Sequence, residues 1–140
     1  MNQKTSADPL FPRRETTGSV VAVLRTSRDD RGLKLIQERT RCIRRFDIHE
    51  LLVTDEADPK PGGSVDRIGY LGFVEFEVGG AIAIGDLVLI DAKPIGRLVG
   101  FDETHMPNHM NLVLQSQVRT AGLARGLKLG QVLLIKPSPA

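Results

Sequence analysis

The sequence has little aromatic or sulfur chemistry: one cysteine, Cys42, no tryptophan, five phenylalanines and one tyrosine in 140 residues. A single cysteine cannot form an internal disulfide. No basic segment followed by an apolar one opens the chain, so we expect a reducing, cytoplasmic setting. The shortage of aromatic rings argues against a nucleic-acid partner, because proteins that bind single strands stack the bases on such rings.

Long apolar runs and familiar catalytic signatures are also missing. No segment approaches the roughly 18 to 20 apolar residues of a membrane-spanning helix, which argues against a membrane partner. The chain contains no Gly-rich phosphate loop ending in Gly-Lys-Ser/Thr, no Gly-x-Ser-x-Gly, no Cys-x-x-Cys and no His-Glu-x-x-His. The enzyme classes that depend on these motifs therefore have no support.

The pattern that is present is typical of an all-β protein. From Gly18 onward, short apolar stretches alternate with Gly, Pro or Asp, and residues 70–78 place apolar side chains on one face and glutamates on the other. The sequence predicts one compact small β-barrel of about eight strands over residues 18–140. It also predicts a hairpin of residues 19–25 with 33–39. Residues 1–17 contain prolines and arginines without apolar periodicity, so we expect a flexible arm there.

An internal similarity favours a barrel of two related halves. Residues 80–90 align without gaps on residues 125–135, which lie 45 positions later. Each copy carries a glycine, Gly85 or Gly130, that can take a positive φ before an apolar strand. The alternative is chance similarity between Gly- and Leu-rich segments.

Charge is distributed unevenly along the chain. Residues 11–45 hold ten basic against four acidic side chains, residues 46–103 hold four against twelve, and residues 104–140 hold four against none. Such asymmetry can mark a face for an anionic partner, or the strands can pair their charges across the sheet. Arg39, Arg41 and Arg45 share strand parity and offer either an anion clamp or a solvated face. Cys42, among these arginines, is either a reactive thiolate or a structural thiol.

The residues most suited to chemistry gather in one segment, 101–109. It holds carboxylates, imidazoles and an amide, in what the flanking strands indicate is a loop: Asp102, Glu103, His105, Asn108 and His109. Functional groups are often carried on loops of a rigid scaffold. One alternative is a divalent metal such as zinc bound by His105 and His109, with His49 as the only remaining histidine ligand. Pro107 disfavours the helix that would aim both loop histidines at one ion.

Three other interpretations of this loop stay open. A histidine oriented by Asp102 or Glu103 could act as a general acid or base. A neutral imidazole could instead accept a phosphoryl group as a nucleophile. Finally, Asp102 and Asn108 could simply cap a turn while the histidines lie exposed.

Part of the chain resembles a known family. The residues that carry the likeness are Leu71-Gly72, Gly80-Ala-Ile-Ala-Ile-Gly85, Val99-Gly100, His109-Met-Asn-Leu-Val-Leu114 and Leu129-Gly-Gln-Val-Leu133. Over residues 70–140 this pattern resembles the glucitol/sorbitol-specific enzyme IIA component of the bacterial sugar phosphotransferase system. The resemblance implies a small β-barrel that relays phosphate through a histidine, and it implies that His109 matches a histidine preceding a core strand. Residues 1–69 do not share the likeness.

Together these observations predict a protein that binds or acts on a polar, anionic small molecule through residues 102–109. His105 and His109 are the expected working groups, Asp102 and Glu103 the expected orienting carboxylates, and Asn108 shapes the turn. Whether the protein is an enzyme stays open.

Outside the loop, Arg97 lies on the strand that enters it and offers a guanidinium to an anion. One alternative function is a non-catalytic ligand-binding or accessory module, and another is a nucleic-acid binder that uses the arginines of residues 13–45. A homodimer is also compatible with the expected strands.

Overall fold

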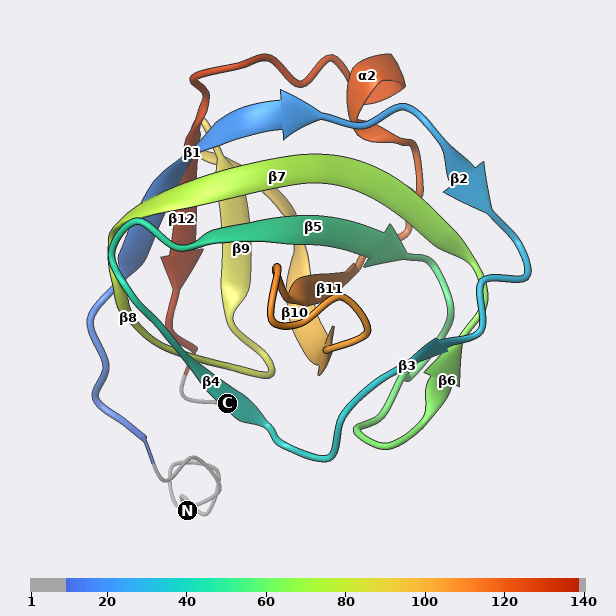
Figure 1. Cartoon of the computed structure of the whole chain (residues 1–140), viewed down its shortest axis with the longest axis horizontal. Coiled ribbons are helices and arrows are strands. Elements are labelled where there is room, and N and C mark those ends of the chain that lie inside the picture. Colours follow the sequence, from blue (N-terminus) through green and yellow to red (C-terminus); the bar gives the residue numbers. More distant parts are fainter. Residues whose placement is uncertain (1–9, 139–140) are drawn as a thin grey trace.

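The computed structural model describes residues 10–138, whose regular structure is almost entirely β-strand (Figure 1). Within these residues there is one short helix, α2 (Gly122–Arg125). The strands are β1 (Thr16–Val23), β2 (Ser27–Arg28), β3 (Leu33–Lys34), β4 (Thr40–Ile43), β5 (Ile48–Thr54), β6 (Ser64–Val65), β7 (Ile68–Val78), β8 (Gly80–Ala83), β9 (Leu87–Ile90), β10 (Lys93–Asp102), β11 (Asn111–Gln115) and β12 (Val132–Lys136). No helix within residues 10–138 has the length and apolar character needed to cross a membrane.

Seven strands close into a ring. Their order is β1-β12-β9-β10-β11-β5-β7, and β7 pairs back onto β1, while β2 pairs with the first two residues of β7 on the same edge as β1. Every neighbouring pair is antiparallel except β11 and β5, which run parallel. In Figure 1 the connection from β10 to β11, drawn in orange, lies over the middle of the ring. The prediction of a compact all-β fold of about eight strands is confirmed.

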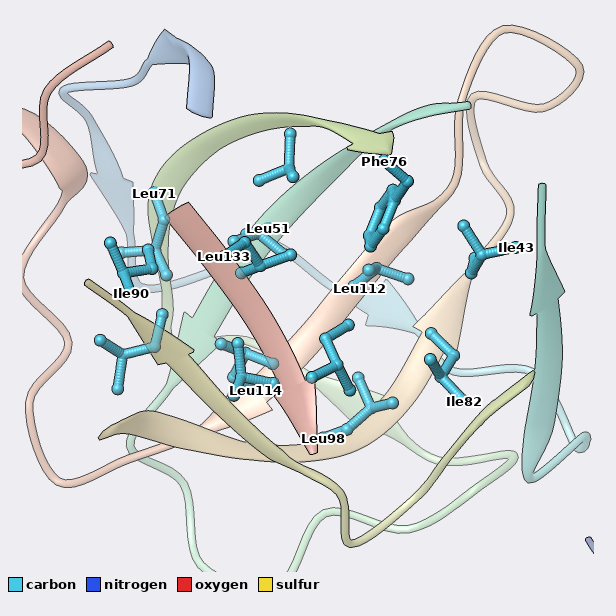
Figure 2. Packing of buried hydrophobic residues seen from close by; sticks show 14 of the residues in the cluster. Ile43, Leu51, Leu71, Phe76, Ile82, Ile90, Leu98, Leu112, Leu114 and Leu133 are labelled. Atoms are coloured by element: carbon cyan, nitrogen blue, oxygen red, sulfur yellow. The ribbon is translucent and has the colours of Figure 1, made fainter. Parts of the chain in front are cut away.

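The two faces of the strands bury two separate apolar clusters. The larger fills the ring and draws a side chain from each of its strands, including Leu51, Leu112 and Leu133 (Figure 2). The smaller lies on the other face of β5, where Leu52 packs with Leu33 and Leu35 beside the paired strands β3 and β6. Because successive strand residues face opposite sides, β5 is buried on both faces. A polar side chain on β5 therefore needs a specific partner.

The repeated segments lie side by side as β9 and β12. They pair antiparallel, with Leu89 opposite its equivalent Leu134, so a local two-fold axis that passes between these two residues relates the two copies. The glycine before each strand takes the expected left-handed conformation, with φ of 98° at Gly85 and 87° at Gly130. Before those glycines the copies differ, since one carries strand β8 and the other ends helix α2. The likeness thus covers a glycine corner and its strand rather than half of the ring.

Two expectations for the amino-terminal part need correction. Residues 19–25 and 33–39 do not form a hairpin, because β1 pairs with β12 and β7, whereas β3 pairs with β6. The expected arm of residues 1–17 is also too long: residues 1–9 lie outside the described residues, but Thr16 and Thr17 belong to β1. Arg13 forms a buried ion pair with Asp86, so the folded unit begins before residue 18.

Candidate functional site

Asp102 fixes the start of the loop between β10 and β11. Its buried carboxylate accepts hydrogen bonds from the backbone N–H of Thr104 at 3.0 Å, the Thr104 hydroxyl at 2.8 Å and the Asn111 side-chain amide at 2.9 Å. These are the bonds of a turn-capping aspartate. Of the interpretations left open by the sequence, the structural one describes Asp102.

His109 is held by contacts on both of its ring nitrogens. Nε2 lies 3.1 Å from Glu50 Oε1 and Nδ1 lies 2.7 Å from Asn108 Oδ1. The ring of Phe73 meets the imidazole edge to face, with 4.9 Å between ring centroids. Only 13% of the His109 side chain and 9% of the Glu50 side chain are exposed. The imidazole is therefore oriented from three sides.

Strand register explains why Glu50 reaches this place. In the sheet, Glu50 of β5 lies opposite Asn111 of β11 on one side and opposite Phe73 of β7 on the other, and Asn111 lies opposite Asp102 of β10. Paired residues of neighbouring strands project to the same face. The result is a cross-strand row of Asp102, Asn111, Glu50 and Phe73, onto which His109 folds; the three polar side chains are buried and Phe73 is partly exposed.

The contacts of His109 define where protons can lie. An amide oxygen can only accept a hydrogen bond, so Nδ1 donates its proton to Asn108. Nε2 and Glu50 then share a proton, either as imidazolium with carboxylate or as neutral imidazole with carboxylic acid. Burial raises the pKa of Glu50 above its ordinary value, while the hydrogen bond and the charge of His109 act in the opposite direction. Such a pair can take up or release a proton.

The remaining acidic and basic groups of the loop are arranged differently from the prediction. His105 is exposed, and its ring centroid lies 5.0 Å from that of His109. Glu103 forms an ion pair with Arg41. The described contacts of Asp102 and Glu103 involve neither histidine, so the prediction that these two carboxylates orient the histidines is wrong. The carboxylate that holds His109 is Glu50. The sequence did contain a signal for this role, because Glu50 is a charged residue directly before the apolar segment Leu51-Leu52-Val53.

His49 lies on the opposite face of β5 from Glu50. Its Nδ1 accepts the backbone N–H of Met110 at 3.0 Å, and its Nε2 lies 3.6 Å from Asp47 Oδ2. Since Nδ1 accepts, the neutral ring carries its proton on Nε2. Burial lowers the pKa of His49, and Asp47 partly opposes that effect. His49 is thereby a neutral group with an N–H directed away from Met110.

The histidines do not assemble into the expected metal site. His49 and Glu50 are strand neighbours that face opposite sides, so His49 is separated from His109 by the strand itself. In the part of the chain from residue 10 to 138, no group of three or more His, Cys, Asp or Glu side chains is placed to hold a metal ion. The zinc alternative remains a prediction without a ligand set.

A small cavity lies between β4, the start of β5 and the loop. Its volume is about 200 Å³, and its polar lining comes from Arg41, Cys42, Arg44, Asp47, His49 and Asn108. That volume corresponds to about seven water molecules at roughly 30 Å³ each. The cavity therefore admits a small molecule of a few heavy atoms. Asn108 belongs both to this lining and to the His109 contact.

Arg97 does not join this site. It lines another cavity together with Gly85, and its Nη1 donates to the Gly85 carbonyl oxygen at 2.9 Å. Arg97 lies near the middle of β10, five residues before the loop begins at Asp102. An extended strand of that length spans roughly 16 Å, which is too far for a guanidinium to help His109.

Comparison with known proteins gives one match. The model of a family described as "Family of unknown function (DUF6917)" matches residues 10–136. No curated protein and no solved structure matches the chain. The resemblance of residues 70–140 to the glucitol/sorbitol-specific enzyme IIA component is not supported by any of these comparisons and stays a prediction.

Proposed function

The chain belongs to the DUF6917 family of unknown function, and we propose that it binds a small oxyanion, such as phosphate or a short carboxylate, in the cavity beside Asn108. A bound ligand there would exchange a proton with the Glu50–His109 pair. The observation that carries the proposal is the contact of His109 Nε2 with buried Glu50 while Nδ1 meets only the exposed Asn108 amide.

The lining of the cavity supports an anionic ligand. Arg41 and Arg44 contribute two guanidinium groups, although Arg41 also pairs with Glu103 and Arg44 lies 3.7 Å from Asp47, the one carboxylate among the described lining residues. His49 adds an N–H on Nε2 whose position is fixed because Met110 occupies the other nitrogen. Charged and fixed donors of this kind bind oxyanions more strongly than neutral ones.

The proposed proton path joins Glu50, the two ring nitrogens of His109 and the ligand. A ligand oxygen that replaces Asn108 Oδ1 would receive the proton from His109 Nδ1, while Nε2 takes the proton from Glu50. One proton passes from Glu50 to the ligand, and Glu50 then regains a proton from the solvent, so that each ligand bound takes up one proton from the buffer. This is the division of work between an acid/base histidine and its orienting carboxylate. The single cysteine supports a reducing, cytoplasmic setting for this activity.

Calorimetric titration with inorganic phosphate tests the proposal. Heats measured in two buffers that differ in ionisation enthalpy report both the affinity and the number of protons exchanged on binding. We expect saturable binding accompanied by proton exchange in the wild type. In Glu50→Gln, binding should persist and the proton exchange should disappear.

Arg44→Gln tests the ligand side of the same experiment. Arg44 is exposed, so its replacement should leave the fold intact and weaken binding by about tenfold, as expected for one charge-assisted contact. Arg28→Gln is the matched control, because Arg28 is also exposed and pairs only with Asp30 in the described contacts. Binding without proton exchange in the wild type would favour the non-catalytic binding module instead.

A further inference from the structure

A second, larger groove lies away from His109, along the segment of residues 57–61 that follows β5. It consists of two adjoining hollows of about 440 Å³ and 580 Å³. Asp58, Pro59 and Ile84 line both hollows, whereas Arg97 lines only the first and Arg39 only the second. The two arginines therefore belong to the two ends of one groove.

The middle of the groove is firmly held and combines apolar surface with one neutralised charge. Pro59 and Ile84 line it throughout together with Asp58, whose carboxylate pairs with Lys60, and Val99 of β10 adds apolar surface at one end. The backbone N–H of Ile84 donates to Arg39 O at 3.0 Å, and that of Gly85 donates to Leu98 O at 2.7 Å. Backbone bonds thus tie the floor to both flanking segments, and prolines restrict the opposite wall.

The charges of the groove are not balanced. Asp58, the only carboxylate in the lining, forms an ion pair with Lys60 at 2.9 Å. Among residues 10–138, the exposed side chain of Arg39 contacts no carboxylate. Within the described part of the chain, the side chain of Arg97 is held by its hydrogen bond to the Gly85 carbonyl oxygen. As far as residues 10–138 show, each end of the groove therefore presents one guanidinium without a carboxylate partner.

From this arrangement we propose that the groove binds a small dicarboxylate, an elongated molecule with an anionic group at each end and an apolar middle. Guanidinium groups bind carboxylates through two parallel N–H bonds, and the apolar segment of the ligand would cover Ile84 and Pro59. The groove shares no lining residue with the cavity beside Asn108, so this proposal does not depend on the function proposed for that cavity.

Calorimetric titration of the full chain tests the ligand class. The probes are unbranched α,ω-dicarboxylates of four to eight carbons, with the monocarboxylate and the diol of the same length as comparisons. We expect the best dicarboxylate to bind about tenfold more tightly than its monocarboxylate, since one charge-assisted contact is lost. The diol should give no saturable heat. Equal affinities for the dicarboxylate and the monocarboxylate, or no saturable binding of either, would overturn the proposal.

Variants test the two ends. Arg39→Gln and Arg97→Gln should each reduce the affinity for the dicarboxylate to that of the wild type for the monocarboxylate. Arg28→Gln, a replacement of an exposed arginine outside the groove, is the control and should change nothing. Thermal unfolding of each variant checks that the fold is retained. If either groove variant binds the dicarboxylate as well as the control does, the assignment is wrong.

Discussion

The backbone N–H of Met110 determines the protonation of His49. A second proton on the ring would have to lie on Nδ1, where it would face the Met110 N–H across 3.0 Å. Burial adds to this effect and lowers the pKa of His49, although Asp47 partly compensates. His49 is thus suited to donate one hydrogen bond and poorly suited to act as a base.

This arrangement predicts an acid-sensitive contribution to stability. The unfolded chain binds a proton at His49 near pH 6.5, whereas the folded chain binds it only at lower pH. The contribution of His49 to the free energy of unfolding is therefore fully present above pH 6.5. It is lost as the pH drops toward the pKa of His49 in the folded chain, by up to about 1.4 kcal/mol per pH unit. Urea unfolding between pH 7.5 and 5 should show a smaller loss in His49→Gln than in the wild type. Equal losses would contradict this account of His49.

Glu50 provides a second test at this scale. Its raised pKa means that the folded state disfavours the carboxylate, and the cost appears as the pH rises above the ordinary value of 4.5. If Glu50 had a purely structural role, its replacement would strongly destabilise the fold. If its role is functional, the fold keeps a buried carboxyl group at some cost in stability, and its replacement changes stability little. We expect Glu50→Gln to change the free energy of unfolding at pH 7 by less than about 1 kcal/mol, because an amide can still bond to His109. A loss of about 3 kcal/mol or more, measured by urea unfolding, would make Glu50 structural.

At the scale of elements, the two glycine corners before β9 and β12 show how a short sequence pattern sets local geometry. Gly85 and Gly130 occupy equivalent positions and both have positive φ. No atom lies within 4 Å of a Cβ placed on either one. Their role is therefore conformational. Gly122 and Gly69 differ, because a Cβ on either would overlap a backbone carbonyl oxygen.

Replacement by alanine should reduce the free energy of unfolding by different amounts at the two kinds of glycine. Gly130→Ala should cost about 1 kcal/mol, the usual penalty of a left-handed alanine. Gly69→Ala should cost several times more, because its Cβ would meet the carbonyl oxygen of Arg119, which cannot move as a side chain can. Denaturant unfolding of the two variants measures both values. Similar costs would show that the backbone near Arg119 adapts.

The strands also show what the sequence could and could not reveal. Local alternation was sufficient to predict β7, because Val74 and Phe76 are buried while Glu77 is exposed. The pairing of β1 was not predictable in this way, since β1 completes the ring with β12, more than a hundred residues away in the chain. The same limit applies to the site: Asn108 and His109 could be identified as candidates, but their link to Glu50, 59 positions away from His109, depends on strand register.

On the scale of the whole molecule, Asp86 joins three distant parts of the chain. Its fully buried carboxylate accepts hydrogen bonds from both terminal nitrogens of the Arg13 guanidinium, at 2.7 and 2.8 Å. It also accepts the backbone N–H groups of Ala83 at 2.9 Å and Ser138 at 3.3 Å. The turn between β8 and β9 thereby holds the segments before β1 and after β12, the strands that complete the ring.

Removal of one partner of this buried pair should be costly. We expect Arg13→Gln to lower the free energy of unfolding by about 3 kcal/mol, because Asp86 would keep a buried charge without its cation. Arg28→Gln, which removes an exposed ion pair, should cost less than about 0.5 kcal/mol. Urea unfolding of both variants makes the comparison, and equal costs would mean that the amino-terminal segment adds little to the folded unit.

The central claim is that an oxyanion in the cavity beside Asn108 contacts His49 and acts on the Glu50–His109 pair through Asn108, which both lines the cavity and contacts His109 Nδ1. Histidine ¹⁵N NMR measures this most directly, since the chain has only three histidines and each ring nitrogen reports its own proton. During titration with inorganic phosphate at pH 7, we predict saturable shifts at His49 Nε2 and His109 Nδ1 with the same apparent Kd. Shifts confined to the exposed His105, or a linear drift without saturation, would contradict the account.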